Sequence, residues 1–232
     1  MLIGFPSCSV GRVVTAVSSP SFEDLETQYK DLISGGRHSP SECLARHHVA
    51  VIIAYRNRED HLKTLLYNLH GYLQRQQLDY GIFVIEQAGV TRFNRAMLMN
   101  IGFKEAIASS NFTCFIFHDV DHIPENDNNI YSCSGNPRHL AVAVEKNKYR
   151  RLYTTYFGGV SALSRRTMED VNGFSNLYFG WGGEDDDMWR RYIYINKLHY
   201  MYFNESLLMR TSFFRKQLPR IFFYWRKRRK CL

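Results

Sequence analysis

Three short apolar runs, separated by two segments with apolar residues at helical spacing, set the strongest limit on how this chain folds. The runs are residues 49–54, 80–85 and 112–117. Each is short enough for a strand buried on both faces, and the intervening helical patterns cover residues 62–73 and 93–109. Strands that alternate with helices at this spacing form βαβ units. The sequence therefore predicts an α/β fold with a mainly parallel central sheet flanked by helices.

Weaker patterns extend this layout on both sides. Ser21 and Asp24 fit a capping box at the start of a short helix. Apolar runs at residues 140–144 and 157–163 predict further strands, and a helix is expected over residues 184–196. No internal repeat is visible, so a single α/β domain with appendages accounts for the length.

The third apolar run ends in two carboxylates, Asp119 and Asp121, which are one residue apart. Ligands of α/β sheets bind beyond the C-terminal ends of strands, and hard cations that bridge phosphate oxygens are commonly held by one or two carboxylates. The pattern favours a metal and diphosphate site, although Asp-x-Asp after a strand also occurs in solvated turns. An EF-hand loop is excluded, because its ligand and glycine positions are occupied here by Ile123, Pro124 and Ile130.

Two further segments follow strands or open helices in a way that suits a ligand. Arg56 and Arg58 come directly after the first apolar run, where guanidinium groups and helix N-terminal amides suit an anionic or uridine-bearing ligand. The same arginines also fit a solvated polar loop. Phe93 opens the second helical segment, and its ring suits either stacking on a base or the core. These residues alone leave both interpretations open.

The second dense motif is Phe-Gly-Trp-Gly-Gly-Glu-Asp-Asp-Asp, residues 179–187. Glycines on both sides of Trp181 predict a mobile loop that carries one large flat ring, a platform suited to a sugar. The four acids open a helix, whose macrodipole stabilises carboxylates. Four adjacent like charges nevertheless repel one another, and a carboxylate beside a sugar-binding ring can act as a base in glycosyl transfer. A structural and a catalytic interpretation both remain.

The formal net charge of +8 comes from the end of the chain. Eight of the 30 Lys and Arg residues lie beyond residue 213, and the remaining 22 equal the 22 Asp and Glu residues. The body of the chain is neutral and gives no electrostatic basis for binding nucleic acid. Residues 213–232 predict a solvated basic end, or an amphipathic stretch at 221–225 that contacts an anionic membrane or acidic glycan. No apolar run of about eighteen residues is present, so any membrane anchor is expected to be absent from this chain.

A series of stretches occurs in one order between about residues 35 and 190. They are Gly35-Gly-Arg37, Tyr55-Arg-Asn-Arg58, Leu73-Gln-Arg-Gln-Gln-Leu-Asp-Tyr80, Phe93-Asn-Arg-Ala96, His118-Asp-Val-Asp121, Pro137-Arg-His139, Phe157-Gly-Gly-Val-Ser-Ala-Leu-Ser164, Asn172-Gly-Phe174 and Gly180-Trp-Gly-Gly-Glu-Asp-Asp-Asp187. This series resembles the β-1,4-galactosyltransferase family, the metal-dependent inverting transferases that use UDP-galactose. The last stretch, following Asp-Val-Asp, is the most specific of them.

The resemblance implies a GT-A-like nucleotide-sugar transferase domain over residues 35–195. It would be preceded by an N-terminal segment, residues 1–34, and followed by a divergent basic and aromatic tail, residues 196–232. The implied reaction transfers galactose from UDP-galactose to a terminal N-acetylglucosamine or related acceptor, in β-1,4 linkage and with inversion. Mn²⁺ is the implied cofactor, and the Golgi lumen is the implied location, in a type II membrane protein.

Carried over position by position, the resemblance also implies roles for individual residues. The expected donor-binding residues are Tyr55, Arg56, Arg58, Phe93, Asp119, Val120, Lys146, Tyr156 and Trp181. The expected acceptor-binding residues are Tyr153, Gly183, Asp185 and Asp186. Asp121 would bind manganese, and Asp185 would be the general base with Glu184 as a second catalytic carboxylate. Tyr156 would favour UDP-galactose over UDP-N-acetylgalactosamine by crowding the C2 substituent, and Cys8 with Cys43 would match the family's N-terminal disulfide.

The likeness ends at about residue 195. The family continues with a methionine–histidine segment that supplies two further manganese ligands, and with a long loop that closes over the donor; this chain shows no convincing counterpart of either. The alternative function is therefore a catalytically impaired relative that still binds UDP-sugar. This hypothesis predicts low or no transferase activity.

Overall fold

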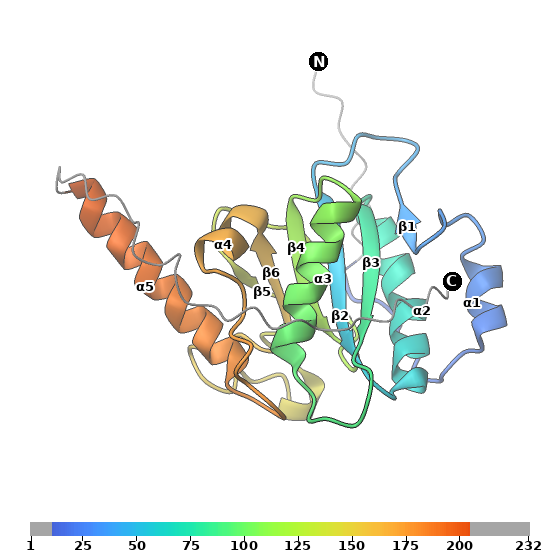
Figure 1. Ribbon diagram of the computed structural model, residues 1–232. Helices are drawn as coiled ribbons and strands as arrows, with labels where there is room; N and C mark the ends of the chain where they lie inside the picture. Colours follow the sequence, from blue (N-terminus) through green and yellow to red (C-terminus); the bar gives the residue numbers. More distant parts are fainter. Residues whose placement is uncertain (1–10, 205–232) are drawn as a thin grey trace, which may run out of the picture.

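The computed structural model describes residues 11–204, which form a six-stranded sheet flanked by helices (Figure 1). The strands are β1 (Arg37–His38), β2 (His48–Tyr55), β3 (Asp79–Glu86), β4 (Cys114–Asp119), β5 (Arg138–His139) and β6 (Val160–Ser164). The helices are α1 (Phe22–Gln28), α2 (Glu59–Arg75), α3 (Arg95–Ser109), the 3₁₀ turn η1 (Glu145–Asn147), α4 (Arg165–Asp170) and α5 (Glu184–Asn204). The strand order is β1-β3-β2-β4-β6-β5.

The sheet is mixed, and its longest pairings are parallel. β2 lies between β3 and β4 and runs parallel to both. β1, β6 and β5 add antiparallel pairings at the two sides. The predicted α/β class and the βαβ units are confirmed, and the parallel strands end together at one edge, where α2 and α3 begin.

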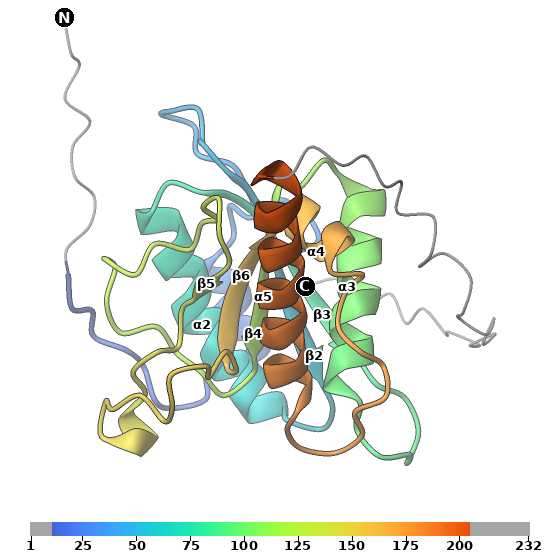
Figure 2. The same cartoon turned by 90° about the vertical axis from the view of Figure 1, so that its left-hand side faces the viewer.

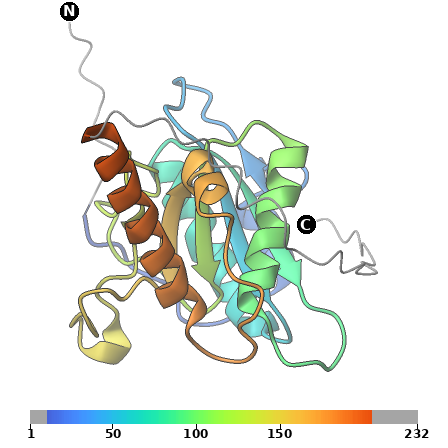
Figure 3. The same ribbon diagram turned by 60° about the vertical axis from the view of Figure 1, so that its left-hand side comes forward.

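The helices cover two faces of the sheet. Val49, Val51 and Ile53 of β2 face the core layer beneath α2, while Ala50 and Ile52 face the layer beneath α3. Figure 2 shows α2 and α3 on opposite sides of the strands. Figure 3 shows α3, α4 and α5 together on one face. Because β2 is covered on both faces, its apolar run is continuous rather than alternating.

Three of the sequence-based expectations need correction. Residues 140–144 do not form a strand: Leu140 and Ala141 are buried, but both of their amides donate to the single carbonyl of Val160 and no ladder follows. The strand expected at residues 157–163 begins only at Val160, because Gly159 has a φ of 76°. Helix α5 also runs past the expected end at residue 196 to Asn204, since neither Gly nor Pro interrupts it.

The capping box predicted for the first helix is confirmed. The side chain of Ser21 accepts from the backbone N–H of Asp24, and the carboxylate of Asp24 accepts from the backbone N–H of Ser21. These two bonds satisfy N–H groups that a helix start leaves without partners. They fix the start of α1, which packs beside α2.

A disulfide joins Cys114 in β4 to Cys133 in the long loop before β5. It ties that loop to a central strand. Cys43 makes no disulfide within residues 11–204, and Cys8, its expected partner, lies outside the described residues. The basic end at residues 213–232, with its predicted amphipathic stretch, also lies outside them.

We predict that Gly102→Ala destabilises the fold. A Cβ at Gly102 would overlap Ile52 Cγ2 and lie 2.9 Å from Ile85 Cγ1, because α3 packs closely on β2 and β3. Ala normally favours a helix by about 1 kcal/mol over Gly, but overpacking here should reverse the sign and cost about 1–3 kcal/mol. Urea unfolding measures the change.

Gly135→Ala is the matched control, because a Cβ there meets no atom within 4 Å. The control should change the free energy of unfolding by less than about 0.5 kcal/mol. A Gly102→Ala variant as stable as the wild type would show that α3 does not contact the sheet as closely as described.

Candidate active site

The first cluster of functional side chains lies where β4 ends. The N–H of Asp119 donates to the carbonyl of Gly159 at 3.0 Å, and the N–H of His122 donates back to the carbonyl of Asp119 at 3.4 Å. This tight turn brings ligand atoms of Asp119, Asp121 and His122 within 4.8 Å of one another. Two carboxylates and one imidazole form a donor set that fits a divalent cation such as Mn²⁺.

Basic groups surround the carboxylate of Asp121. His122 Nδ1 lies 3.2 Å from Asp121 Oδ1, and Arg58 Nη1 lies 3.5 Å from Asp121 Oδ2. The hydrogen bond from His122, assisted by the nearby charges of His122 and Arg58, lowers the pKa of Asp121 to about 2. Asp121 is therefore ionised at neutral pH, as a metal ligand must be.

The second cluster opens helix α5. Gly183 has a φ of 97°, and a Cβ there would lie 2.7 Å from the ring of Tyr178, so only glycine fits the turn that leads into the helix. The four acids predicted from the sequence occupy the first turn of α5. The N–H of Gly180 donates to the carbonyl of Phe93 at 2.7 Å. This bond holds the loop before α5 beside the loop before α3, at the lower edge of the molecule in Figure 1.

Arg95 joins the two clusters. Its Nε donates to Asp119 Oδ1 at 2.5 Å, and its Nη1 donates to Glu184 Oε1 at 3.0 Å. The side chains of Arg95 and Glu184 are only 14% and 8% exposed, respectively. One guanidinium therefore ties the end of β4 to the start of α5 and brings the two acidic motifs together.

Asp185 lies next to Glu184 and is half-buried. Its Oδ2 sits against the α-carbon of Gly158, in space that any side chain at residue 158 would occupy. Burial, and then the charge of Glu184, raise the pKa of Asp185, while the charge of Arg95 opposes this rise. Raised pKa values in partly buried carboxylates are typical of groups that accept or donate protons in catalysis.

Tyrosines 153 and 156 line the same region. The hydroxyl of Tyr153 donates to both carboxylate oxygens of Asp186, at 2.9 and 3.1 Å, and its ring packs edge-on against Tyr156. Burial, together with the charges of Asp185 and Asp119, raises the pKa of Tyr156. Its ring also lies against Gly158, beside the carboxylate of Asp185.

The arginine and aromatic residues predicted near the donor contact one another. Arg56 lies over the ring of Phe93, with 5.2 Å from guanidinium carbon to ring centroid, and donates to the carbonyl of Thr91 at 2.6 Å. Tyr55 is the last residue of β2. Phe93 also packs against the core layer beneath α3, as the core interpretation of its ring expects, and its stacking on a base stays a prediction.

Three predicted site residues stand apart from these contacts. The side chain of Val120 is buried in the core. Lys146 is exposed on η1, and the Trp181 side chain is fully exposed on its glycine loop. Within residues 11–204 no hydrogen bond or ion pair links Lys146 or Trp181 to the acidic clusters.

The structure adds residues to the site that sequence reasoning did not assign. These are Arg95, His122, His139 and Gly158. His139 Nε2 lies 2.7 Å from the carbonyl oxygen of Gly158. Arg95 lies inside a family-like stretch, and His122 adjoins Asp121. These positions in the sequence indicated that both residues are near the site, but they do not reveal which carboxylate each side chain contacts.

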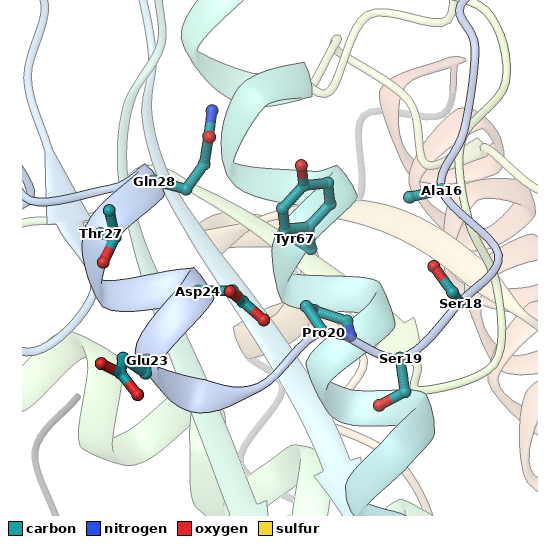
Figure 4. A pocket seen from close by; sticks show the side chains of 9 residues that line it. All are labelled: Ala16, Ser18, Ser19, Pro20, Glu23, Asp24, Thr27, Gln28 and Tyr67. Carbon is teal, nitrogen blue, oxygen red and sulfur yellow. The ribbon is translucent and has the colours of Figure 1, made fainter.

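A separate surface groove, seen from close by in Figure 4, lies at α1, which Figure 1 shows at the opposite end of the molecule from α5. It is lined by Ala16, by residues 18–20, by α1 and by Tyr67 of α2. It contains none of the residues predicted to bind donor, acceptor or metal. Its walls are the capped start of α1, so we assign it no chemistry.

Comparison with known families agrees with this geometry. Residues 5–134 match the family model described as the N-terminal region of glycosyl transferase group 7. Residues 138–210 match the model described as the N-terminal domain of galactosyltransferase. The two models together span both acidic clusters. The chain belongs to glycosyl transferase group 7.

Its curated relatives are β-1,4-galactosyltransferases. The chain is 49% identical over 199 residues to β-1,4-galactosyltransferase 1 of Homo sapiens, covering 83% of this chain and 50% of that protein. It is 58% identical over 156 residues to β-1,4-galactosyltransferase 4 of Cricetulus griseus, covering 67% and 45%. The chain thus spans about half the length of the curated relatives it matches.

A solved relative shares the fold. The catalytic domain of Drosophila β-1,4-galactosyltransferase 7, in complex with xylobiose, superposes with a TM-score of 0.59 at 34% identity, covering 65% of this chain and 62% of that one. A mutant of the same enzyme, in complex with manganese, UDP-Gal and xylobiose, superposes equally well at 33% identity. The match supports the GT-A-like architecture predicted from the sequence.

We predict that Arg95→Met destabilises the protein by about 3 kcal/mol, because removal of one partner leaves the poorly solvated carboxylates of Glu184 and Asp119 without their counter-charge. Thermal or urea unfolding measures this loss. Arg165→Met is the control: its partner Glu169 is i,i+4 on the same helix, and both side chains are about half exposed. That pair should contribute less than about 0.5 kcal/mol. Equal losses in the two variants would contradict the bridging role of Arg95.

Proposed function

We propose that this chain is a β-1,4-galactosyltransferase catalytic unit. It transfers galactose from UDP-galactose to a terminal N-acetylglucosamine or related acceptor, with inversion at the anomeric carbon. The observation that carries the proposal is the double ion pair of Arg95, which holds the Asp119 end of β4 beside the acid-rich start of α5. A donor bound at the first cluster would therefore present its sugar to the second.

The donor side of the site would use residues at the ends of β2 and β4. Arg56 and Arg58 carry positive charge toward this edge, and Phe93 offers a ring beside Arg56 for a base. Asp121, with Asp119 beside it, would hold Mn²⁺. When bound, that ion stabilises negative charge on the departing diphosphate. The manganese and UDP-Gal complex of the Drosophila relative supports this assignment.

The acceptor side would use Asp185 as the general base. The acceptor hydroxyl loses its proton to the Asp185 carboxylate as its oxygen bonds to the anomeric carbon, and the bond from that carbon to the diphosphate oxygen breaks on the opposite face. Asp186, which already accepts from Tyr153, would bind acceptor hydroxyls together with Gly183 and the Tyr153 ring. Glu184 would position rather than transfer protons, because Arg95 occupies its buried carboxylate.

Tyr156 would select the donor. Its half-buried ring lies against Gly158, beside the carboxylate of Asp185, and there it would crowd the C2 substituent of the transferred sugar. Trp181 and Lys146, which are exposed, would have to move toward the donor to contact it. Trp181 lies between glycines that permit such a motion.

The proposed location is the lumen of the Golgi. The Cys114–Cys133 disulfide supports an oxidising compartment. Among residues 11–204 no helix combines the length and the apolar character needed to cross a bilayer.

We predict that Asp185→Asn lowers kcat by about 10²–10⁴-fold, since the amide cannot accept the acceptor's proton. The assay is transfer of radiolabelled galactose from UDP-galactose to N-acetylglucosamine in the presence of Mn²⁺. Donor binding, measured by calorimetry, should stay within about twofold of the wild type, because Asp185 acts on the acceptor. Asp187→Asn is the matched control in the same acidic run, since Asp187 pairs with Arg191 on α5.

The outcomes separate the candidate functions. Turnover that survives Asp185→Asn would reject Asp185 as the base. Donor binding by the wild-type chain without any turnover would identify the catalytically impaired, UDP-sugar-binding relative instead.

We predict that transfer falls on acidification at a pH above that expected for an ordinary aspartate. A carboxylate base works only when deprotonated, and burial with the charge of Glu184 raises the pKa of Asp185 above its usual 3.8. The rate should therefore be full above the raised pKa and fall as the pH drops through it. The measurement is kcat/KM against pH, with donor binding followed over the same range to separate loss of the base from loss of the donor. An acidic limb centred at or below 3.8 would contradict the assignment.

A further inference from the structure

We propose that His122 is a direct ligand of the divalent cation at the end of β4. The inference rests on the proposed function only in its use of a metal at this place. It assigns to a side chain of this chain a role that neither the sequence motifs nor the family likeness gave it. The complete local donor set would then be Asp119, Asp121 and His122.

The backbone brings these three side chains together without help from distant elements. The turn closed by the bond from the His122 N–H to the Asp119 carbonyl places residue 122 back beside the end of the strand. A Cβ at Gly159 would lie 2.9 Å from His122 Nε2, so the imidazole packs directly on the bare α-carbon of Gly159. Gly159 is itself bound to β4 through its carbonyl, which fixes the ring at the site.

The ion pairs around the site leave His122 Nδ1 facing the oxygen of Asp121 that Arg58 does not contact. Arg95 takes Oδ1 of Asp119, and Arg58 lies near Oδ2 of Asp121. His122 Nδ1 instead faces the other oxygen of Asp121, Oδ1, at 3.2 Å. Two ligand atoms of one cation lie about this far apart when each is about 2.1–2.2 Å from the ion. A cation can therefore replace the proton that the imidazole and the carboxylate share.

A nitrogen ligand also changes which metals the site prefers. Carboxylate sites suit Mg²⁺, Ca²⁺ and Mn²⁺, whereas imidazole favours metals later in the divalent series, such as Co²⁺ and Zn²⁺. If His122 is a ligand, its removal should weaken Mn²⁺ binding, weaken Co²⁺ binding more strongly, and leave Mg²⁺ binding nearly unchanged. A histidine that only balances the charge of Asp121 predicts the opposite, because its removal would free the carboxylate for any cation.

The test is metal binding by the full chain without nucleotide or acceptor. Calorimetric titrations with Mn²⁺, Co²⁺ and Mg²⁺ compare the wild type with His122→Leu and His122→Gln. We expect Mn²⁺ affinity to fall about tenfold or more, with a larger fall for Co²⁺ and less than about twofold for Mg²⁺. His47→Leu is the matched control, because His47 precedes β2 at the opposite end of the sheet and should change nothing. Pulsed EPR of bound Mn²⁺ should show a ¹⁴N coupling that both His122 variants lose.

Each outcome decides one question. Unchanged or tighter Mn²⁺ binding in the His122 variants, or the absence of a ¹⁴N coupling in the wild type, overturns the inference and leaves His122 as an ion-pair partner. Asp121→Asn tests the metal site itself: it should abolish binding of all three metals. Unchanged binding in that variant would instead refute the metal site of the proposed function, whatever His122 does.

Discussion

The site depends on one buried guanidinium that neutralises carboxylates from two distant parts of the chain. Asp119 ends a central strand and Glu184 opens a helix on one face of the sheet, and Arg95 lies between them. Without that positive charge, the acids of the two clusters would repel one another in a poorly solvated space. The ion pairs therefore set the distance between the place where a diphosphate would bind and the place where a proton would be removed.

The sheet supports this arrangement because its central strands β2 and β4 are each paired on both sides. Residues 49–54 of β2 are buried on both faces, and β4 is held by β2 on one side and β6 on the other. Rigid strands ending at one edge place short loops there, and loops on a rigid frame carry most binding residues. The Cys114–Cys133 disulfide adds a covalent link from the same strand to the long loop that precedes β5.

The sequence was informative wherever one local pattern determined the outcome. Continuous apolar runs located β2, β3 and β4, and the acid-rich motif at residues 184–187 opens a helix as expected. The apolar pattern at residues 140–144 wrongly predicted a strand. Leu140 and Ala141 are buried in the core, but they form no ladder of hydrogen bonds with a neighbouring strand. The sequence pattern also could not assign Arg95 or His122, since the partners of a basic side chain are set by tertiary contacts. The Cys114–Cys133 pair was missed for the same reason.

The half-burial of Asp185 follows from the same packing that positions it. Gly158 leaves room for the carboxylate, and the carbonyl of Gly158 is held by His139. Loss of solvent raises the pKa of Asp185, and Glu184 adds to this rise, while Arg95 counteracts it. A carboxylate kept too acidic would be a poor base, and one left fully desolvated would stay protonated. Arg95 thus opposes the rise that burial and Glu184 cause in the pKa of Asp185, so the bridge that assembles the site also acts on its proposed base.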